Sequence, residues 1–307
     1  MINTGIIGAG SRDAGELIRL LAMHPEIDIK TAYEKGLEGK PLPSHHHGLI
    51  GETDLSFSTT VDLRGLDVLF ICDNNIGAEQ LKVLADTHPE LKTIYMAYRP
   101  GIDEESNGMV YGLPEINRKA LVRGAVRACV PSSFASMALV ALYPLALHLL
   151  LQDDITLNIS APEPLILKYD LKIVSEEISR QLRKVQQSFN SDIKISATPS
   201  ASRRSAVMQI DFKCGVSREQ LEKLYEMYDD HNFAFLVQNP PGVSEVAGTN
   251  RCILSVSSPE ENRIAISVAA DCRLRGAAGE AVHIMNLMFG LHEKTGLSLK
   301  AIDFDPI

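Results

Sequence analysis

Two adjacent serines, Ser132 and Ser133, follow a predicted buried strand and precede a long apolar stretch. This position predicts a helix N-terminus, where backbone amides and the helix dipole can stabilise an anion. A serine nucleophile would also need a histidine base. Of the nine histidines, only His148 and His283 lie in apolar helical contexts. We therefore favour an N-cap role for one of the two serines over a hydrolase site.

A glycine turn near the N-terminus has the position of a phosphate-binding loop. Gly8 and Gly10 follow the predicted strand Ile2–Ile7, and they would let the backbone turn tightly and approach a pyrophosphate at a helix N-terminus. The match to G-x-G-x-x-G is imperfect, because Ser11 and Arg12 precede an aspartate. The turn predicts a dinucleotide site with contacts from these four residues. The alternative is a tight turn that binds nothing.

Glu34 comes directly after the second predicted strand, Ile27–Tyr33. An acidic side chain at this position accepts a hydrogen bond from the 2′-hydroxyl of an adenosine ribose. If a dinucleotide binds, Glu34 favours NAD over NADP, because a 2′-phosphate would meet a like charge. The alternative is a solvated charge beside Lys35.

Two other groups of side chains could hold a ligand. His45, His46 and His47 are consecutive in a predicted loop, with no carboxylate at a ligand spacing, so we expect a solvated loop and no metal site. Arg203 and Arg204 could hold the carboxylate or phosphate of a small anionic metabolite. Exposed charge is the alternative for this pair.

The composition is that of a globular protein, with 45% hydrophobic and 22% charged residues. A net charge of −9 repels phosphate backbones and anionic lipid, so we expect neither a nucleic-acid partner nor a membrane surface. Five scattered cysteines are typical of a reducing cytoplasm rather than a disulfide framework. No signal-peptide pattern is visible, and the apolar stretch Met137–Leu151 is too short to span a bilayer. We therefore expect a cytoplasmic protein.

Strands and helices alternate in the first part of the chain, which is typical of a doubly wound parallel sheet. After about residue 150, β-rich runs surround two polar helices, at Ser175–Phe189 and Ser217–Tyr228. The predicted fold class is α/β: a Rossmann-like parallel-sheet domain with an inserted α+β domain of mostly antiparallel sheet. We assign residues 1–132 and 277–307 to the dinucleotide-binding domain and 133–276 to the substrate or dimerisation domain. In the first domain, the remaining predicted strands are Leu66–Cys72, Lys92–Ala97 and Val126–Val130, and the predicted helices are Ala14–His24, Ala78–Thr87 and Gly276–Leu291.

Three stretches, Tyr111–Arg118, Pro131–Leu145 and Arg275–Leu291, resemble the N-acetyl-gamma-glutamyl-phosphate reductases of the aspartate-semialdehyde-dehydrogenase-like family. The resemblance covers nearly the whole chain. It implies an NADP(H)-dependent reaction in arginine biosynthesis. In the family's reaction, a cysteine attacks an acyl phosphate and forms a thioester. The thioester then receives a hydride, an aldehyde leaves, and a histidine acts as acid and base. We place Gly279, in the last stretch, at the cofactor.

The chain departs from the family at the reacting groups. The family's Asn-Pro-Gly-Cys turn has Ser133 at the nucleophile position, and serine needs a neighbouring base to match a thiolate. Aligning the family's His-x-His-x-Pro-Glu-Ile stretch on Glu177–Ile178 removes both histidines and puts Val174 at the base position. The glycine-rich insertion before this stretch is shortened, and the family's Asn after Asp271 is Cys272. These losses together predict that the ancestral reductase activity is absent.

The leading interpretation is a pseudoenzyme that still binds a nucleotide, NAD or NADP, or a small anionic metabolite. We expect a homo-oligomer, or a hetero-oligomer with an active homologue, because the inserted sheet is the family's usual association surface. One alternative is an active NAD(P)-dependent oxidoreductase that transfers hydride directly to an aldehyde or acyl substrate. Another is a structural or regulatory partner of an active homologue.

Overall fold

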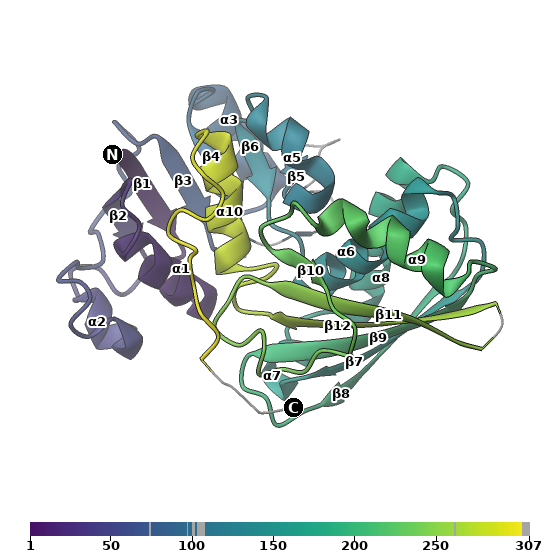
Figure 1. The fold of residues 1–307 in the computed structure, drawn as a ribbon. Helices are drawn as coiled ribbons and strands as arrows, with labels where there is room; N and C mark the ends of the chain where they lie inside the picture. Colours follow the sequence, from purple (N-terminus) through teal and green to yellow (C-terminus); the bar gives the residue numbers. More distant parts are fainter. Residues whose placement is uncertain (74, 97, 100–101, 103–107, 261, 303–307) are drawn as a thin grey trace. The chain divides into compact units, whose positions relative to one another are not determined.

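The computed structural model divides the chain into two units and describes residues 1–307 except 74, 97, 100–101, 103–107, 261 and 303–307 (Figure 1). The first unit is Met1–Pro131 with Ala277–Ser298, and the second is Ser132–Gly276 with Leu299–Ile307. From the sequence, the segment Leu299–Ile307 was assigned to the dinucleotide-binding domain. It groups with the second unit because the Ile302 N–H donates to the Ala247 carbonyl of that unit at 3.0 Å.

A parallel sheet of six strands forms the first unit, in the order β2-β1-β3-β4-β6-β5. Its strands are β1 (Ile2–Ile7), β2 (Ile27–Tyr33), β3 (Val68–Ile71), β4 (Lys92–Tyr95), β5 (Val110–Tyr111) and β6 (Arg127–Cys129). After β1 the chain forms β2 on one side of it and then crosses to form β3 on the other side. The direction in which strands are added to the sheet therefore reverses at β1. Ligands of open α/β sheets bind at the carboxyl ends of strands at such a point. The glycine turn directly follows β1.

The helices described in the first unit are α1 (Arg12–Ala22), α2 (Leu42–His45), the 3₁₀ turn η1 (His47–Leu49), α3 (Ala78–Thr87), α5 (Pro114–Val122) and α10 (Ala278–Met288). Helix α1 begins after Ser11, whose side chain accepts a hydrogen bond from the Ala14 amide at 3.1 Å. Its apolar residues recur at helical spacing and are buried. Helix α10 packs against α1, α5 and β4, so the C-terminal helix belongs to the first unit.

The second unit has a mixed sheet in the order β10-β11-β12-β9-β7-β8. Its four central strands pair antiparallel, and the edge strands β10 and β8 pair parallel to their neighbours. The fold class predicted from the sequence is thereby confirmed. The strand bounds are β7 (Ile155–Ala161), β8 (Ile193–Pro199), β9 (Ser205–Lys213), β10 (Ala234–Leu236), β11 (Cys252–Glu260) and β12 (Arg263–Asp271).

Helix α6 (Ser133–Leu147) is the core of the second unit and is buried on nearly all sides. Proline lacks an N–H and removes one hydrogen bond from a helix interior. Pro144 therefore leaves the Val140 carbonyl without its helical donor, and the Tyr228 hydroxyl donates to this carbonyl at 2.7 Å. The other helices of this unit are α7 (Glu163–Ile166), α8 (Leu171–Val185), α9 (Arg218–Tyr225) and the 3₁₀ turn η2 (Glu226–Tyr228).

Several observed boundaries differ from the predicted ones by a few residues. Helix α8 begins at Leu171 rather than Ser175, because the Asp170 side chain caps it by accepting from the Lys172 amide at 2.9 Å. Strand β4 ends at Tyr95, and the predicted strand end at Ala97 lies outside the described residues.

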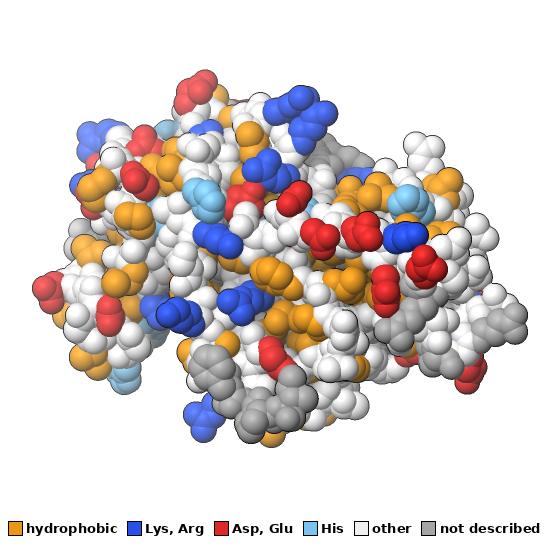
Figure 2. Space-filling model, viewed as in Figure 1, with side chains coloured by type: hydrophobic (Ala, Val, Ile, Leu, Met, Phe, Trp, Pro, Cys, Tyr) orange, Lys and Arg blue, Asp and Glu red, His pale blue; other side chains and the backbone are white. Residues whose placement is uncertain are grey.

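Acidic side chains gather over α9 and η2 on the face drawn in Figure 2. They are the exposed residues Glu219, Glu222, Glu226, Asp229 and Asp230. This surface would repel a phosphate backbone, as the net charge of −9 also indicates. In the described part of the chain, no helix is both long and apolar enough to cross a membrane.

Candidate functional site

The glycine turn after β1 is held tightly between two strands. Gly8 has a φ of 77°, and a Cβ at this position would lie 2.4 Å from the Asp73 amide nitrogen beyond β3. Only glycine meets both requirements without strain. The amides of Gly8 and Ala9 both donate to the Tyr33 carbonyl at the end of β2, at 3.0 Å each.

Glu34 lies directly against this turn. Its Oε2 accepts a hydrogen bond from the Gly10 amide at 2.9 Å. A Cβ on Gly10 would lie 2.7 Å from the Glu34 Cγ, so a larger residue would displace this carboxylate. The structure thus brings together Gly8, Gly10, Ser11 and Glu34, and it places the Arg12 side chain on the exposed first turn of α1.

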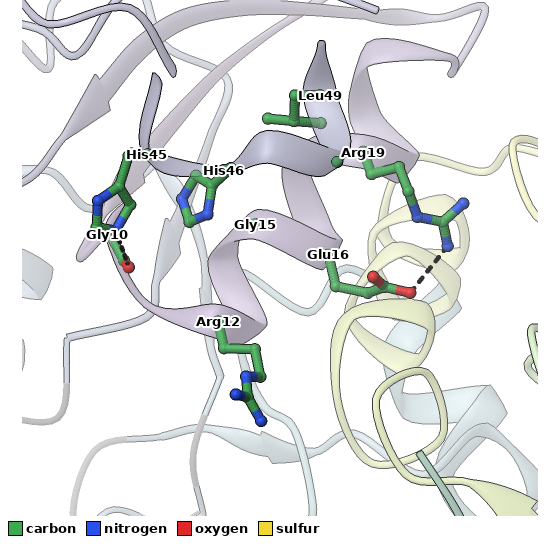
Figure 3. Close-up of a pocket in the computed structure, with 9 residues that line it drawn as sticks. Gly10, Arg12, Gly15, Glu16, Arg19, His45, His46 and Leu49 are labelled. Atoms are coloured by element: carbon green, nitrogen blue, oxygen red, sulfur yellow. Dashed lines mark hydrogen bonds and ion pairs between the residues drawn. The ribbon is translucent and has the colours of Figure 1, made fainter. Parts of the chain in front are cut away.

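A cavity of about 340 Å³ adjoins the turn, between α1 and the α2–η1 segment (Figure 3). Its lining includes His45 and His46, which the sequence analysis assigned to a solvated loop. That assignment holds only in part: His45 and His47 are exposed, but His45 Nε2 lies 2.9 Å from the Gly10 carbonyl oxygen, and Nε2 of the half-buried His46 lies 2.7 Å from that of Ala9. Burial lowers the pKa of His46. No group of three or more histidine, cysteine or acidic side chains suited to a metal occurs in the described ranges.

At the start of α6, the two serines have different roles. Ser132 is the N-cap, and its Oγ accepts a hydrogen bond from the Ala135 amide at 3.3 Å. The buried carboxylate of Glu177 in α8 accepts from both the Ser132 amide, at 3.0 Å, and the Ser132 hydroxyl, at 2.6 Å. The structure confirms that one of the serines is an N-cap.

Ser133, which the sequence resemblance aligns with the family's cysteine, has no exposed side-chain surface. Its Oγ donates to the Cys272 carbonyl at 3.0 Å and lies 3.1 Å from the Tyr169 hydroxyl. A hydroxyl has one proton, so the Tyr169 phenol is the donor in the second contact. The Gly276 carbonyl lies at 3.3 Å. In the part of the chain that the structure describes, the Ser133 side chain is thus hydrogen-bonded to carbonyls and a phenol, and to no imidazole or carboxylate.

The side chains that we considered as substitutes for the family's cysteine and histidine are buried. Burial raises the pKa of the Cys272 thiol far above its ordinary range, so this sulfur is not a thiolate near neutrality. Cys129 is fully buried in β6, as expected for a structural cysteine. Val174, which the sequence resemblance aligns with the family's base, is 2% exposed and lies on the buried face of α8.

Arg204 and Arg203 differ in their surroundings. The Arg204 guanidinium pairs with the buried carboxylate of Asp271, which also accepts from the Gly248 amide at 2.7 Å and the Arg273 amide at 3.0 Å. Arg203 is exposed. Anion binding by this pair stays a prediction.

Gly279 is buried in the first turn of α10, directly before Glu280, which belongs to a buried cluster of titratable side chains. His283 lies 3.7 Å from a Glu280 carboxylate oxygen and 3.2 Å from one of Glu293. The Glu293 carboxylate also pairs with Arg118 at 2.6 Å. Burial opposes charge on His283, but the two carboxylates outweigh it and raise the pKa of this imidazole.

This raised pKa predicts a pH dependence of stability. A group whose pKa is higher in the folded state stabilises that state fully below its unfolded pKa, and this contribution is lost as pH rises through the folded pKa. The free energy of unfolding of the wild type relative to His283→Asn should therefore be largest below pH about 6.5 and decrease toward alkaline pH. Urea unfolding at pH 6, 7.5 and 9 measures this difference. The exposed His47→Asn variant is the control, and a difference that grows with pH would refute the assignment.

Several contacts were not predicted from the sequence: those of Tyr169 with Ser133, of Glu177 with Ser132, and of the two histidines with the glycine turn. Each contact joins residues at least 35 positions apart in the chain. For the histidines, the residue type could have indicated such contacts, because an imidazole N–H can donate to a backbone carbonyl.

Comparisons with known proteins fit this geometry. Residues 3–123 match the family model described as semialdehyde dehydrogenase, NAD binding domain. The N-acetyl-gamma-glutamyl-phosphate reductase of Phocaeicola vulgatus is 33% identical over 324 residues, covering 99% of this chain and 100% of the relative. That of Bacteroides thetaiotaomicron is 32% identical over 325 residues, covering 99% and 100%.

Solved structures show the same fold at lower identity. Aspartate semialdehyde dehydrogenase II from Vibrio cholerae, complexed with ASA, has a TM-score of 0.68 at 14% identity, covering 94% of this chain and 98% of that one. Aspartate semialdehyde dehydrogenase with NADP from Candida albicans has a TM-score of 0.63 at 12% identity, covering 94% and 98%.

Proposed function

This chain belongs to the N-acetyl-gamma-glutamyl-phosphate reductase family, and we propose that it is a member that binds a nicotinamide dinucleotide without reducing an acyl phosphate through a covalent intermediate. The observation that carries this proposal is the state of Ser133. Its side chain is fully buried, its proton is donated to the Cys272 carbonyl, and its oxygen accepts from Tyr169.

The covalent reaction makes demands that these residues do not meet. A nucleophile must lose its proton to a base and form a bond to the acyl carbon as phosphate leaves. A backbone carbonyl is too weak a base to accept that proton, and a phenol donating to Ser133 lowers the electron density on its oxygen. The valine at the base position supplies no proton acceptor. An oxygen ester would also be a poorer hydride acceptor than a thioester.

The dinucleotide part rests on the first unit. Gly8 and Gly10 let the backbone approach a pyrophosphate at the N-terminus of α1, and Ser11 caps that helix. Glu34 would accept from the adenosine ribose, since its carboxylate already lies against the turn. When bound, the nicotinamide would supply hydride chemistry. We propose NAD rather than NADP, because a 2′-phosphate would meet the Glu34 charge.

Calorimetric titration with NAD⁺, NADH, NADP⁺ and NADPH tests the proposal; the chain has no tryptophan for fluorescence quenching. We expect NAD forms to bind at least tenfold more tightly than NADP forms. Glu34→Gln should reduce this preference, because it removes the repelling charge. Glu38→Gln removes the same charge from an exposed position four residues along and should preserve the preference. If none of the four nucleotides binds, the dinucleotide proposal is wrong.

Two other interpretations predict different results. An oxidoreductase that transfers hydride directly would oxidise NADH in the presence of a carbonyl panel. A purely structural partner would bind no dinucleotide and would co-purify with an active homologue.

We also propose that the chain oligomerises through the mixed sheet of the second unit. Sedimentation of the purified chain would test this proposal.

A further inference from the structure

The α2–η1 segment is attached to the glycine turn by two imidazoles. His46 Nε2 lies 2.7 Å from the Ala9 carbonyl oxygen, and His45 Nε2 lies 2.9 Å from that of Gly10. Figure 3 shows His45 reaching the turn above the start of α1, with His46 beside it. A carbonyl oxygen only accepts, so in both rings Nε2 carries the proton.

These bonds act on the peptide groups that would face a ligand. In a trans peptide the C=O and the N–H point in opposite directions within one plane. The Ala9 carbonyl and the Gly10 N–H belong to the same peptide group. His46 holds its carbonyl end, and Glu34 accepts from its N–H end at 2.9 Å. His46 therefore fixes the direction in which the Gly10 N–H points.

Gly15 in α1 supplies independent support for a dedicated position of the His46 ring. A Cβ at Gly15 would lie 2.6 Å from His46 Nδ1 and 2.9 Å from its Cε1. Glycine inside a helix is destabilising relative to alanine by roughly 0.5–1 kcal/mol. Here its absent side chain is the space in which the imidazole packs.

Charged side chains of α1 line the same cavity as the two imidazoles. Arg19 on α1 pairs with Glu16 at 2.9 Å, and Arg12 lies on the exposed first turn of the same helix. The Phe57 ring is 6.2 Å from the His46 ring, centroid to centroid.

We propose that His46, supported by His45, is a positioning residue of the dinucleotide site, because it orients the Ala9–Gly10 peptide so that the Gly10 N–H donates to Glu34 and holds this carboxylate where it would accept from the adenosine ribose. The inference rests on the proposed dinucleotide binding. The imidazole itself does not contact the ligand in this account; it acts through the backbone.

The first test measures NAD⁺ affinity by calorimetry. His46→Leu removes the donor and should weaken binding at least tenfold. His46→Gln keeps an N–H donor at a similar reach and should bind within threefold of the wild type. His47→Leu is the matched control, because His47 is exposed in the same segment, and it should bind like the wild type. Equal affinity for His46→Leu and the wild type would overturn the proposal.

The second test needs no ligand. Hydrogen exchange of the amides of residues 8–11 should be faster in His46→Leu than in the wild type and should be restored in His46→Gln. Gly15→Ala should give the same acceleration, because its methyl group displaces the ring, and this variant serves if His46→Leu fails to fold. If no dinucleotide binds but exchange changes in this pattern, the proposed function fails and the role of His46 in orienting the peptide stands. Unchanged exchange in both His46→Leu and Gly15→Ala would overturn it.

Discussion

Gly276→Ala is expected to destabilise the protein by roughly 3 kcal/mol. Gly276 has a φ of 62°, which costs an L-residue about 1–2 kcal/mol. A Cβ there would also lie 2.4 Å from the Ser133 Cα and 2.7 Å from its amide nitrogen. These are backbone atoms at the start of α6, so the clash is relieved only by moving the chain, at a cost of about 1–3 kcal/mol.

Gly290→Ala is the matched control for this prediction. Gly290 has a similar φ of 67°, but a Cβ there would meet no atom within 4 Å. It should cost only the conformational term of about 1–2 kcal/mol. Urea unfolding of both variants measures the difference. Equal losses in the two variants would show that the 272–276 turn does not close tightly over Ser133.

Glu177→Ala is expected to cost about 3 kcal/mol or more. The Glu177 carboxylate is 1% exposed and accepts two hydrogen bonds from Ser132, and bonds to charged groups contribute roughly 1.5–3 kcal/mol each. Removing the carboxylate also leaves two buried donors at the N-cap of α6 without this acceptor. Thermal and urea unfolding would both detect a loss of this size.

Glu176→Ala is the control on the same helix, because Glu176 is the preceding residue and is exposed. Its effect should stay within about 0.5 kcal/mol. If the two alanine variants had equal stability, the contact between α8 and the start of α6 would contribute nothing.

Much of the fold was predictable because periodicity is a local property. The continuous apolar run that forms β3 and the helical spacing in α1 predicted a doubly wound sheet, and the structure has one. The glycine turn was predictable for the same reason, since strand, glycines and helix are consecutive. The start of α8 was misplaced because Asp170 as a cap is a single-residue signal in a polar stretch.

The surroundings of Ser133 were not predictable from the sequence. The resemblance to the family predicted serine in place of the thiol, but not that the hydroxyl is buried and bonded to Cys272, 139 positions along the chain. The histidines show the same limit. Three consecutive imidazoles in a polar segment are typical of a solvated loop, and only the folded chain places two of them on backbone carbonyls.

We propose that this member of the family forms no covalent acyl intermediate. The most direct measurement incubates the purified chain with N-acetyl-gamma-glutamyl phosphate, determines its intact mass, and records NADH and NADPH oxidation, with an active homologue run in parallel. We expect an unmodified mass and no acyl-phosphate-dependent oxidation, while the homologue turns over. An adduct of one acyl group on Ser133, or oxidation of either cofactor that depends on the acyl phosphate, would contradict it.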